Sequence, residues 1–215
     1  MQNNTIYSII SGIYDMMDLT YFKRNSPRKA MLKLIEDKNI NVLDICTGTG
    51  ANAVIVAKNR KNAKITGIDL SPKMLEIAAN KINQNGLDNI NIIECDAAAT
   101  KLPSNYYDVI IISLVLHEIN DKTASEILKE ASRLLKKDGK LIVIEWEIPK
   151  LLLQKILFLP IMLLEPESFR KFIKKDKKKY FKKHGFSLKR IIHSNYSCIY
   201  YLKKSEQENY YEKII

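Results

Sequence analysis

Short apolar runs recur along the first two thirds of the chain, and most of them are separated by segments with helical spacing. The runs are rich in valine and isoleucine and cover residues 41–46, 64–69, 91–95, 107–113 and 140–145. Such near-continuous apolar runs are typical of strands that are buried on both faces. Five strands that alternate with helices predict an α/β fold whose parallel sheet is covered by helices on both faces.

Capping residues predict where two of the helices begin and where one ends. Ser71 followed by Pro72 is typical of a helix N-terminus, and Gly86 supplies the left-handed backbone that often ends a helix. Thr123 and Glu126 have the spacing of a capping box, which predicts that a second helix begins at Thr123.

The pattern differs at the two ends of the chain. Two short helices, the second over residues 27–36, are expected before the first strand. After the fifth strand, an apolar run over residues 151–164 precedes a basic helix over residues 168–183. Two final strands, residues 188–193 and 198–203, are joined by so short a turn that they must pair antiparallel.

Together these elements predict a seven-stranded, mostly parallel sheet with helices on both faces, an antiparallel last strand and an N-terminal helical cap. We expect a single domain over residues 1–215. Its predicted parts are the cap (1–38), a core (39–148), a lid insert with the basic helix (149–183) and a closing strand pair (184–204).

The formal net charge of +11 is concentrated in the C-terminal third of the chain. Residues 149–215 hold 16 of the 35 lysines and arginines but 6 of the 24 acids, so they carry a net charge of +10. A charge imbalance of this kind is informative about binding partners rather than about fold.

The cysteines and the hydropathy pattern predict the compartment. Three cysteines, an odd number, argue against a disulfide framework and favour a reducing environment. The N-terminus lacks the features of a signal peptide, and no run reaches the roughly 18 apolar residues of a membrane span. We therefore expect a cytoplasmic protein.

Polar residues stand at the ends of the predicted strands, where open α/β sheets bind their ligands. They are Asp44, Asp69, Asp96, Ser113 and Glu145. Between the first strand and its helix lie Gly48 and Gly50, which let the backbone approach a ligand beside the free N–H groups of a helix start. The sequence therefore predicts a ligand site at this edge of the sheet.

Two kinds of ligand suit this glycine turn. Gly48, Gly50 and Ala53 match a dinucleotide fingerprint, and Asp69 lies near the distance expected for a ribose-binding acid. Asp44, however, places a negative charge beside the turn where a pyrophosphate would lie. A cationic or zwitterionic ligand tolerates that charge better, so an NAD-dependent oxidoreductase is the less favoured alternative.

At this point the sequence resembles the class I S-adenosylmethionine-dependent methyltransferases, over about residues 40–203. The matching motifs are residues 42–50, 67–75, 94–97, 102–103, 107–110, 133–141 and 184–186. The resemblance implies a Rossmann-like fold, S-adenosylmethionine as cofactor and S-adenosylhomocysteine as product.

The resemblance also implies roles for individual residues. Asp44 would lie near the ammonium group of the cofactor, Asp69 would bind both ribose hydroxyls, and Asp96 with the backbone of Ala97 would meet the adenine. Many members of the family have glycine where this chain has Cys46, and we interpret the cysteine as a neutral variant. The other expected cofactor contacts are Thr47, Gly48, Gly50, Leu70, Met74 and Ser113.

The implied reaction is attack of a nucleophile on the sulfonium methyl group, to which the protein contributes positioning and a base. His117 and Glu118 are the candidate catalytic residues because they follow the fourth strand toward the cofactor edge. The alternative is that His117 packs against the cofactor or caps the next helix. Tyr7, Tyr14 and Glu145 are expected to line the acceptor pocket. The three histidines are too scattered in sequence to suggest a metal site.

The acceptor is constrained by two features. Residues 13–17 are similar to the N-terminal segment of the menaquinone- and ubiquinone-biosynthesis C-methyltransferases, whereas residues 114–118 depart from their pattern. The apolar run beside the lysine-rich helix suggests a small or amphiphilic acceptor, or peripheral contact with an anionic membrane. The alternative is a buried lid helix followed by an ordinary solvated one.

Two other functions stay open. An RNA methyltransferase would use the basic third as a phosphate track, but no Asn/Asp-Pro-Pro-Tyr-like motif follows the fourth strand, so nucleic acid is the less expected partner. A protein that binds the cofactor without turnover would show no methyl transfer to any acceptor. We expect a monomer or a homodimer.

Overall fold

A computed structural model describes residues 26–149, 167–194 and 196–205, together with Leu151, Leu152, Lys155, Ile156, Phe158, Leu159 and Met162. The first predicted helix, with Tyr7 and Tyr14, lies outside these residues, and so do residues 150, 153, 154, 157, 160, 161 and 163–166 of the predicted lid insert.

Seven strands and six helices are described in this part of the chain. The strands are β1 (Asn41–Ile45), β2 (Lys64–Asp69), β3 (Ile90–Glu94), β4 (Tyr107–Ser113), β5 (Leu135–Trp146), β6 (Phe186–His193) and β7 (Ser197–Lys204). The helices are α2 (Pro27–Leu32), α3 (Ala51–Asn59), α4 (Pro72–Gln84), α5 (Asp121–Leu134), α7 (Glu167–Lys174) and α8 (Lys177–Lys183).

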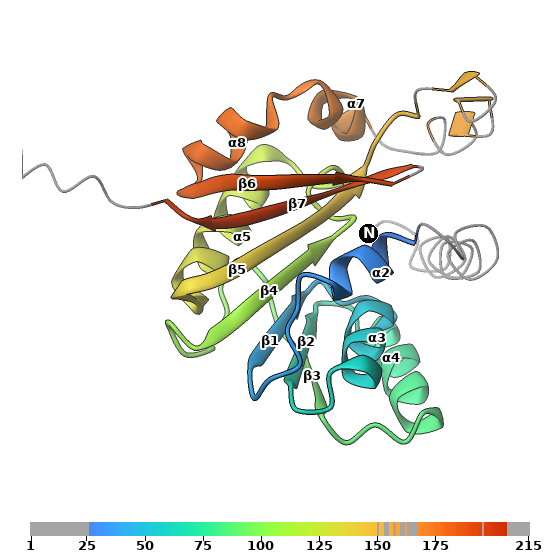
Figure 1. Cartoon of the computed structure of the whole chain (residues 1–215), viewed down its shortest axis with the longest axis vertical. Coiled ribbons are helices and arrows are strands. Elements are labelled where there is room, and N and C mark those ends of the chain that lie inside the picture. Colours follow the sequence, from blue (N-terminus) through green and yellow to red (C-terminus); the bar gives the residue numbers. More distant parts are fainter. Residues whose placement is uncertain are drawn as a thin grey trace, which may run out of the picture.

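The strands form one sheet in the order β3-β2-β1-β4-β5-β7-β6 (Figure 1). β1 to β5 pair in parallel, and β7 is antiparallel to both of its neighbours, β5 and β6. The predicted seven-stranded sheet with an antiparallel last strand is therefore confirmed.

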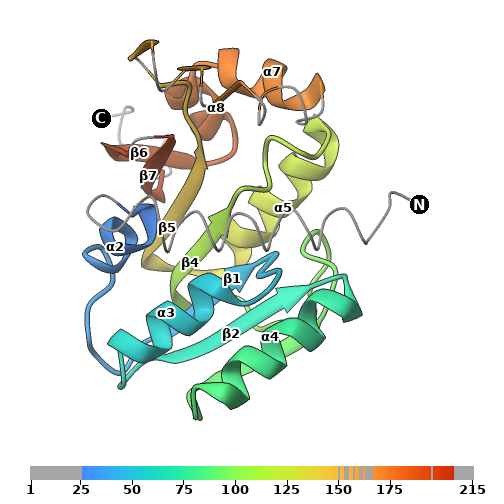
Figure 2. The same ribbon diagram turned by 90° about the vertical axis from the view of Figure 1, so that its right-hand side faces the viewer.

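Alternating side chains of the central strands feed two separate cores. Leu43 and Ile110 face a cluster that includes α5 and Phe181 of α8, whereas Val42 and Val109 face a cluster that includes α2 and α3. Figure 2 shows α3 and α5 on opposite faces of the sheet, with α4 beside α3. Helices on both faces explain why the strands are apolar at successive positions.

Two predicted helix boundaries are wrong, each because a side chain satisfies backbone groups elsewhere. α5 begins after Asn120, whose side chain accepts a hydrogen bond from the N–H of Thr123 at 3.0 Å, so Thr123 is not the cap. α2 ends at Leu32, short of residue 36. The Arg60 guanidinium donates to the carbonyls of Leu32 and Ile35 at 2.5 and 2.6 Å, which satisfies the helix end there.

The predicted basic helix is two helices. Asp176 accepts from the N–H of Lys179 at 3.0 Å and so caps the start of α8. The ammonium group of Lys177 donates to the carbonyls of Phe172 and Ile173 at 2.5 and 3.2 Å, which satisfies the C-terminal end of α7. Burial lowers the pKa of Lys177 to about 8. The break at residues 175–176 therefore follows from two local side chains.

Arg133 of α5 fixes the loop between β3 and β4. It pairs with the buried Glu130, donating to Oε2 at 2.8 Å from Nε, and it donates to the carbonyl of Leu102 at 2.9 Å. The hydroxyl of Thr100 donates to Glu130 at 2.6 Å. These bonds hold the loop that begins at Asp96, one of the predicted cofactor residues. None of the helices in the described ranges is long and apolar enough to cross a membrane.

Candidate cofactor and acceptor site

The turn after β1 runs through three residues with left-handed backbone. Cys46, Gly48 and Gly50 have φ values of +55°, +54° and +73°. The N–H of Thr47 donates to the carbonyl of Ile68 at 2.9 Å, which ties the turn to β2. A cysteine with positive φ is strained relative to glycine, so the interpretation of Cys46 as a neutral variant is wrong for the backbone.

The glycines of this turn have different neighbours. A Cβ on Gly50 would lie 2.9 Å from Cβ of Ala78, so glycine at this position permits the close approach of α3 and α4. A Cβ on Gly48 would meet nothing within 4 Å. The backbone of Gly48 therefore borders open space, as a turn that lies under a ligand requires.

Asp44 lies beneath the turn and is almost completely buried. Its Oδ2 accepts a hydrogen bond from the Thr47 hydroxyl at 2.6 Å, while the buried Oδ1 makes no bond of normal geometry. Burial raises the pKa of Asp44 to about 6, and the Thr47 hydroxyl and the backbone N–H of Ala53 oppose that rise. A buried carboxylate oxygen that lacks a hydrogen bond of normal geometry suits a cationic group of a ligand, such as an ammonium.

Asp69 ends β2 beside the turn and is half-buried. Its Oδ2 accepts from the N–H of Gly48 at 2.8 Å, and its Oδ1 accepts from the N–H of Ser71 at 2.9 Å. These two bonds fix the carboxylate, and each oxygen keeps a lone pair for a ligand hydroxyl. The hydroxyl of Ser71 accepts from the N–H of Met74 at 3.4 Å, as the sequence predicts for a cap, and Leu70 is exposed.

Asp96 follows β3 and is exposed, with its Oδ1 accepting from the N–H of Ala98 at 2.8 Å. Ala97 is buried. Because β1, β2 and β3 are adjacent and parallel, Asp44, Asp69 and Asp96 lie at one edge of the sheet. The structure thus brings together three of the predicted cofactor residues.

A buried acid–base pair lies at the same edge, where β4 and β5 end. His117 Nδ1 contacts Glu145 Oε2, and the side chains are 1% and 0% exposed. The other oxygen of Glu145 accepts from the N–H of Leu116 at 2.8 Å. The chain reaches this arrangement through Ser113, which ends β4, and Leu114, which has a φ of +56°.

Glu118 connects this pair to the surface. Its Oε1 lies 3.9 Å from His117 Nε2, and its side chain is 35% exposed. Three groups therefore run from a fully buried carboxylate through an imidazole to a partly exposed carboxylate. The contact with Glu145 can hold the ring in one orientation, and a side-chain shift of about 1 Å would bring Glu118 within hydrogen-bond distance of Nε2.

An aromatic cluster covers the pair, and sequence reasoning missed it. Phe169 of α7 packs edge-on against His117, with the ring centroids 5.6 Å apart. Phe158 and Trp146 continue the cluster. The spacing of Phe169 and Phe172 places both on one face of a helix, which predicts that they are buried. It does not predict that Phe169 packs against His117.

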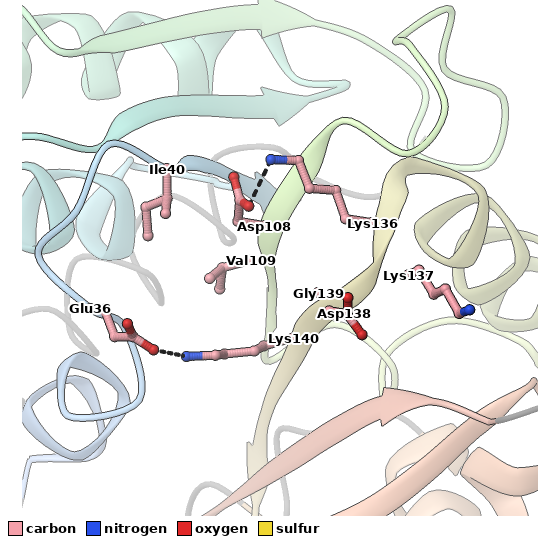
Figure 3. A pocket seen from close by; sticks show the side chains of 9 residues that line it. All are labelled: Glu36, Ile40, Asp108, Val109, Lys136, Lys137, Asp138, Gly139 and Lys140. Atoms are coloured by element: carbon pink, nitrogen blue, oxygen red, sulfur yellow. Dashed lines mark hydrogen bonds and ion pairs between the residues drawn. The ribbon is translucent and has the colours of Figure 1, made fainter.

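A pocket of about 520 Å³ lies at the opposite edge of the sheet (Figure 3). It is lined by the segments that precede β1 and by the first residues of β4 and β5, including Glu36, Asp108 and Lys140. Lys136 pairs with Asp108 at 2.7 Å and Lys140 with Glu36 at 2.9 Å. None of the residues that line it is among the predicted site residues.

The sequence of this chain is similar to known methyltransferases. Residues 42–139 match the model of a protein family that is described as "Methyltransferase domain". A demethylmenaquinone methyltransferase from Listeria welshimeri is 30% identical over 179 residues, which cover 81% of this chain and 75% of that protein.

Solved structures share the fold. A SAM-dependent methyltransferase from Aquifex aeolicus matches with a TM-score of 0.71 and 21% identity, over 89% of this chain and 96% of that one. Magnesium protoporphyrin IX methyltransferase from Synechocystis, with bound S-adenosylhomocysteine, matches with a TM-score of 0.64 and 22% identity, over 83% and 82% of the two chains.

Proposed function

This chain belongs to the class I S-adenosylmethionine-dependent methyltransferases, and we propose that it methylates a small or amphiphilic acceptor with an ionisable hydroxyl, such as a quinol. S-adenosylmethionine supplies the methyl group on a positively charged sulfur. The observation that carries the proposal is the buried His117–Glu145 pair beside the cofactor edge, because removal of a hydroxyl proton needs a base there.

For the cofactor, we assign the ammonium group to Asp44, the ribose hydroxyls to Asp69 and the adenine to Asp96 with the backbone of Ala97. The Oδ1 of Asp44, which lacks a hydrogen bond of normal geometry, and the open side of Gly48 support this assignment. The remaining proposed contacts are Cys46, Thr47, Gly50, Leu70, Met74 and Ser113.

For the acceptor, we assign the first contact to Glu118, whose carboxylate is partly exposed. The hydroxyl proton passes to Glu118 and then to His117 Nε2, while the acceptor takes the methyl group. Glu145 accepts the bond from His117 Nδ1–H, and with Glu118 it balances the charge of the imidazolium. Glu145 is thus proposed as a positioning residue rather than a part of the pocket wall.

The name of the Listeria relative supports a quinone-type acceptor. The aromatic cluster of Trp146, Phe158 and Phe169 supports a planar apolar one, because flat rings pack well on such side chains.

The test is transfer of a labelled methyl group from S-adenosylmethionine. The full chain is incubated with a reduced demethylnaphthoquinone and, separately, with extract fractionated into lipid, small-molecule, protein and nucleic-acid pools. Label in the quinol and the lipid or small-molecule pools is expected. Label confined to RNA would overturn the proposal in favour of an RNA methyltransferase, and label in no pool would favour cofactor binding without turnover.

We also propose that the basic third of the chain rests on an anionic membrane surface. Leu151, Leu152, Ile156 and Leu159 are 50–74% exposed. Phe158 of the same segment packs near Phe169 of α7, at a centroid distance of 6.5 Å, so these apolar side chains adjoin the lysine-rich helices. Apolar area and cations side by side are the two requirements for binding at an anionic interface.

This proposal predicts salt-sensitive binding to anionic vesicles and none to neutral vesicles in a flotation assay. Each lysine near the surface contributes about 1 kcal/mol, so reversing the exposed Lys171, Lys174, Lys178 and Lys179 to glutamate should abolish binding. A matched control reverses Lys58, Lys61, Lys73 and Lys101, which are also exposed, and should still bind. A wild-type chain that ignores anionic vesicles at low salt would instead point to a freely soluble acceptor.

A further inference from the structure

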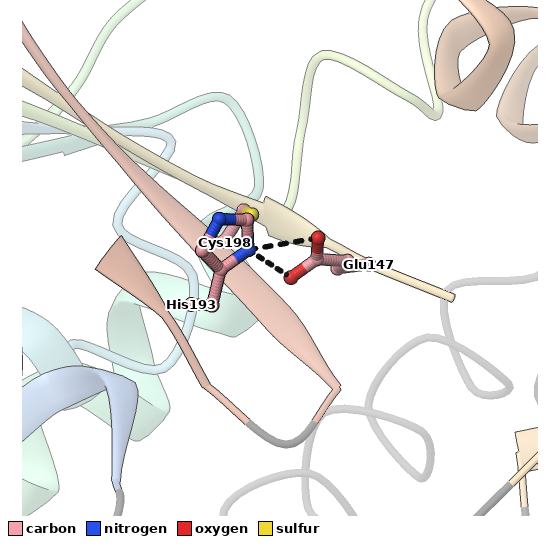
Figure 4. Close-up of side chains that lie close together, drawn as sticks. All are labelled: Glu147, His193 and Cys198. Carbon is pink, nitrogen blue, oxygen red and sulfur yellow. Dashed lines mark hydrogen bonds and ion pairs between the residues drawn. The ribbon is translucent and has the colours of Figure 1, made fainter. Parts of the chain in front are cut away.

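Three potential metal ligands meet at the hairpin of the last two strands. Glu147 follows β5, His193 ends β6 and Cys198 lies near the start of β7, and Figure 4 shows the carboxylate and the imidazole pointing toward one another. One donor atom of each residue lies within 4.8 Å of the other two. The group adjoins the His117–Glu145 pair, because Cys198 is the cross-strand neighbour of Glu145, but it shares no residue with that pair.

The strand register explains why the three side chains converge. His193 pairs with Cys198 across β6 and β7, and Cys198 pairs with Glu145 across β5 and β7. Paired residues point to the same face of a sheet, and so do residues two apart along an extended chain, which brings Glu147 to that face. The N–H of Glu147 donates to the carbonyl of Tyr196 at 2.8 Å, which continues the strand pairing to this residue.

The distances suit a small divalent cation. His193 Nδ1 lies 2.8 Å from Glu147 Oε2 and 3.3 Å from Cys198 Sγ. Zinc bonds of about 2.0–2.3 Å in tetrahedral geometry require donor atoms about 3.3–3.7 Å apart. The two distances from His193 Nδ1 therefore reach those of a zinc site if the exposed His193 side chain shifts by about 0.5 Å or less.

We propose that Glu147, His193 and Cys198 bind one Zn²⁺ ion. A thiolate, an imidazole and a carboxylate together favour zinc over magnesium or calcium, which prefer oxygen ligands alone. Three ligands among the described residues leave a fourth position for water or for a donor atom of another molecule. On binding, the thiol of Cys198 gives up its proton to solvent, and the imidazole keeps one proton on Nε2.

The test measures zinc binding by the full chain. After treatment with a chelator, the wild-type protein is titrated with Zn²⁺ against a chromogenic competitor, and one equivalent is expected to bind. His193→Gln, Glu147→Gln and Cys198→Ser should each weaken binding by about a hundredfold or more, since three ligands share the binding free energy. The matched controls Cys95→Ser and His184→Gln should bind as the wild type does.

A Co²⁺ titration identifies the ligands independently of affinity. The wild type should show thiolate-to-cobalt charge-transfer absorption, which Cys198→Ser should lose and Cys95→Ser should keep. Circular dichroism checks folding, and the exposed His193 provides a variant that does not open the core. The proposal is overturned if the wild type binds no stoichiometric zinc, if the control variants lose binding equally, or if the charge-transfer band is absent.

Discussion

Replacing His117 with glutamine is expected to lower the rate of methyl transfer by about 10²–10⁴-fold, the usual contribution of a general base. Affinity for S-adenosylhomocysteine should change little. Glutamine fills a similar volume and can still donate to Glu145, so the buried carboxylate keeps a partner. Single-turnover rates and calorimetry measure the two quantities.

Glu145→Gln should reduce turnover to a similar degree by a different route. The glutamine amide can donate to Nδ1, which moves the imidazole proton to Nε2 and removes the basic lone pair from that atom. His184→Gln, a half-buried histidine away from the pair, serves as the control and should retain activity. Equal losses of turnover and cofactor affinity in His117→Gln would assign His117 to the cofactor pocket instead.

Replacing Asp69 with alanine is expected to weaken S-adenosylhomocysteine binding by about 10- to 100-fold, because hydrogen bonds to a charged acceptor contribute about 1.5–3 kcal/mol. The substitution also leaves the N–H groups of Gly48 and Ser71 without their acceptor, so the glycine turn loses one of its two attachments to β2 and keeps the bond from Thr47 to Ile68. Calorimetry measures the affinity, and thermal unfolding separates it from a loss of stability.

A suitable control is Asp138→Ala, which removes an exposed carboxylate at the opposite edge of the sheet. Its affinity for S-adenosylhomocysteine should equal that of the wild type. A folded Asp69→Ala variant with unchanged affinity would contradict the assignment of this residue to the ribose.

Much of the fold was predictable because it depends on residues that are close together in the sequence. The apolar runs matched the bounds of β2 and β4, and Ser71 and Gly86 marked the ends of α4. The acids at the strand ends were predictable for the same reason, since parallel strands bring their carboxyl ends to one edge.

The rest depended on contacts between residues far apart in the sequence. Nothing in the neighbourhood of His117 shows that Glu145 will meet it across two strands, and histidines that are scattered in sequence still allow His193 to meet Glu147 and Cys198. The break between α7 and α8 was hidden for a different reason. Asp176 lies within a run of lysines with high helix propensity, where it looked like one more solvated charge.

The position of β7 has a consequence for biosynthesis. This strand is made last among the seven but lies between β5 and β6, so β5 has an unpaired edge until the ribosome has released residues 197–204. During that interval the apolar residues Ile142 and Ile144 lie on a strand edge that can pair with another nascent chain. Pairing with β7 therefore protects this edge of the sheet from aggregation only at a late step in the synthesis of the chain.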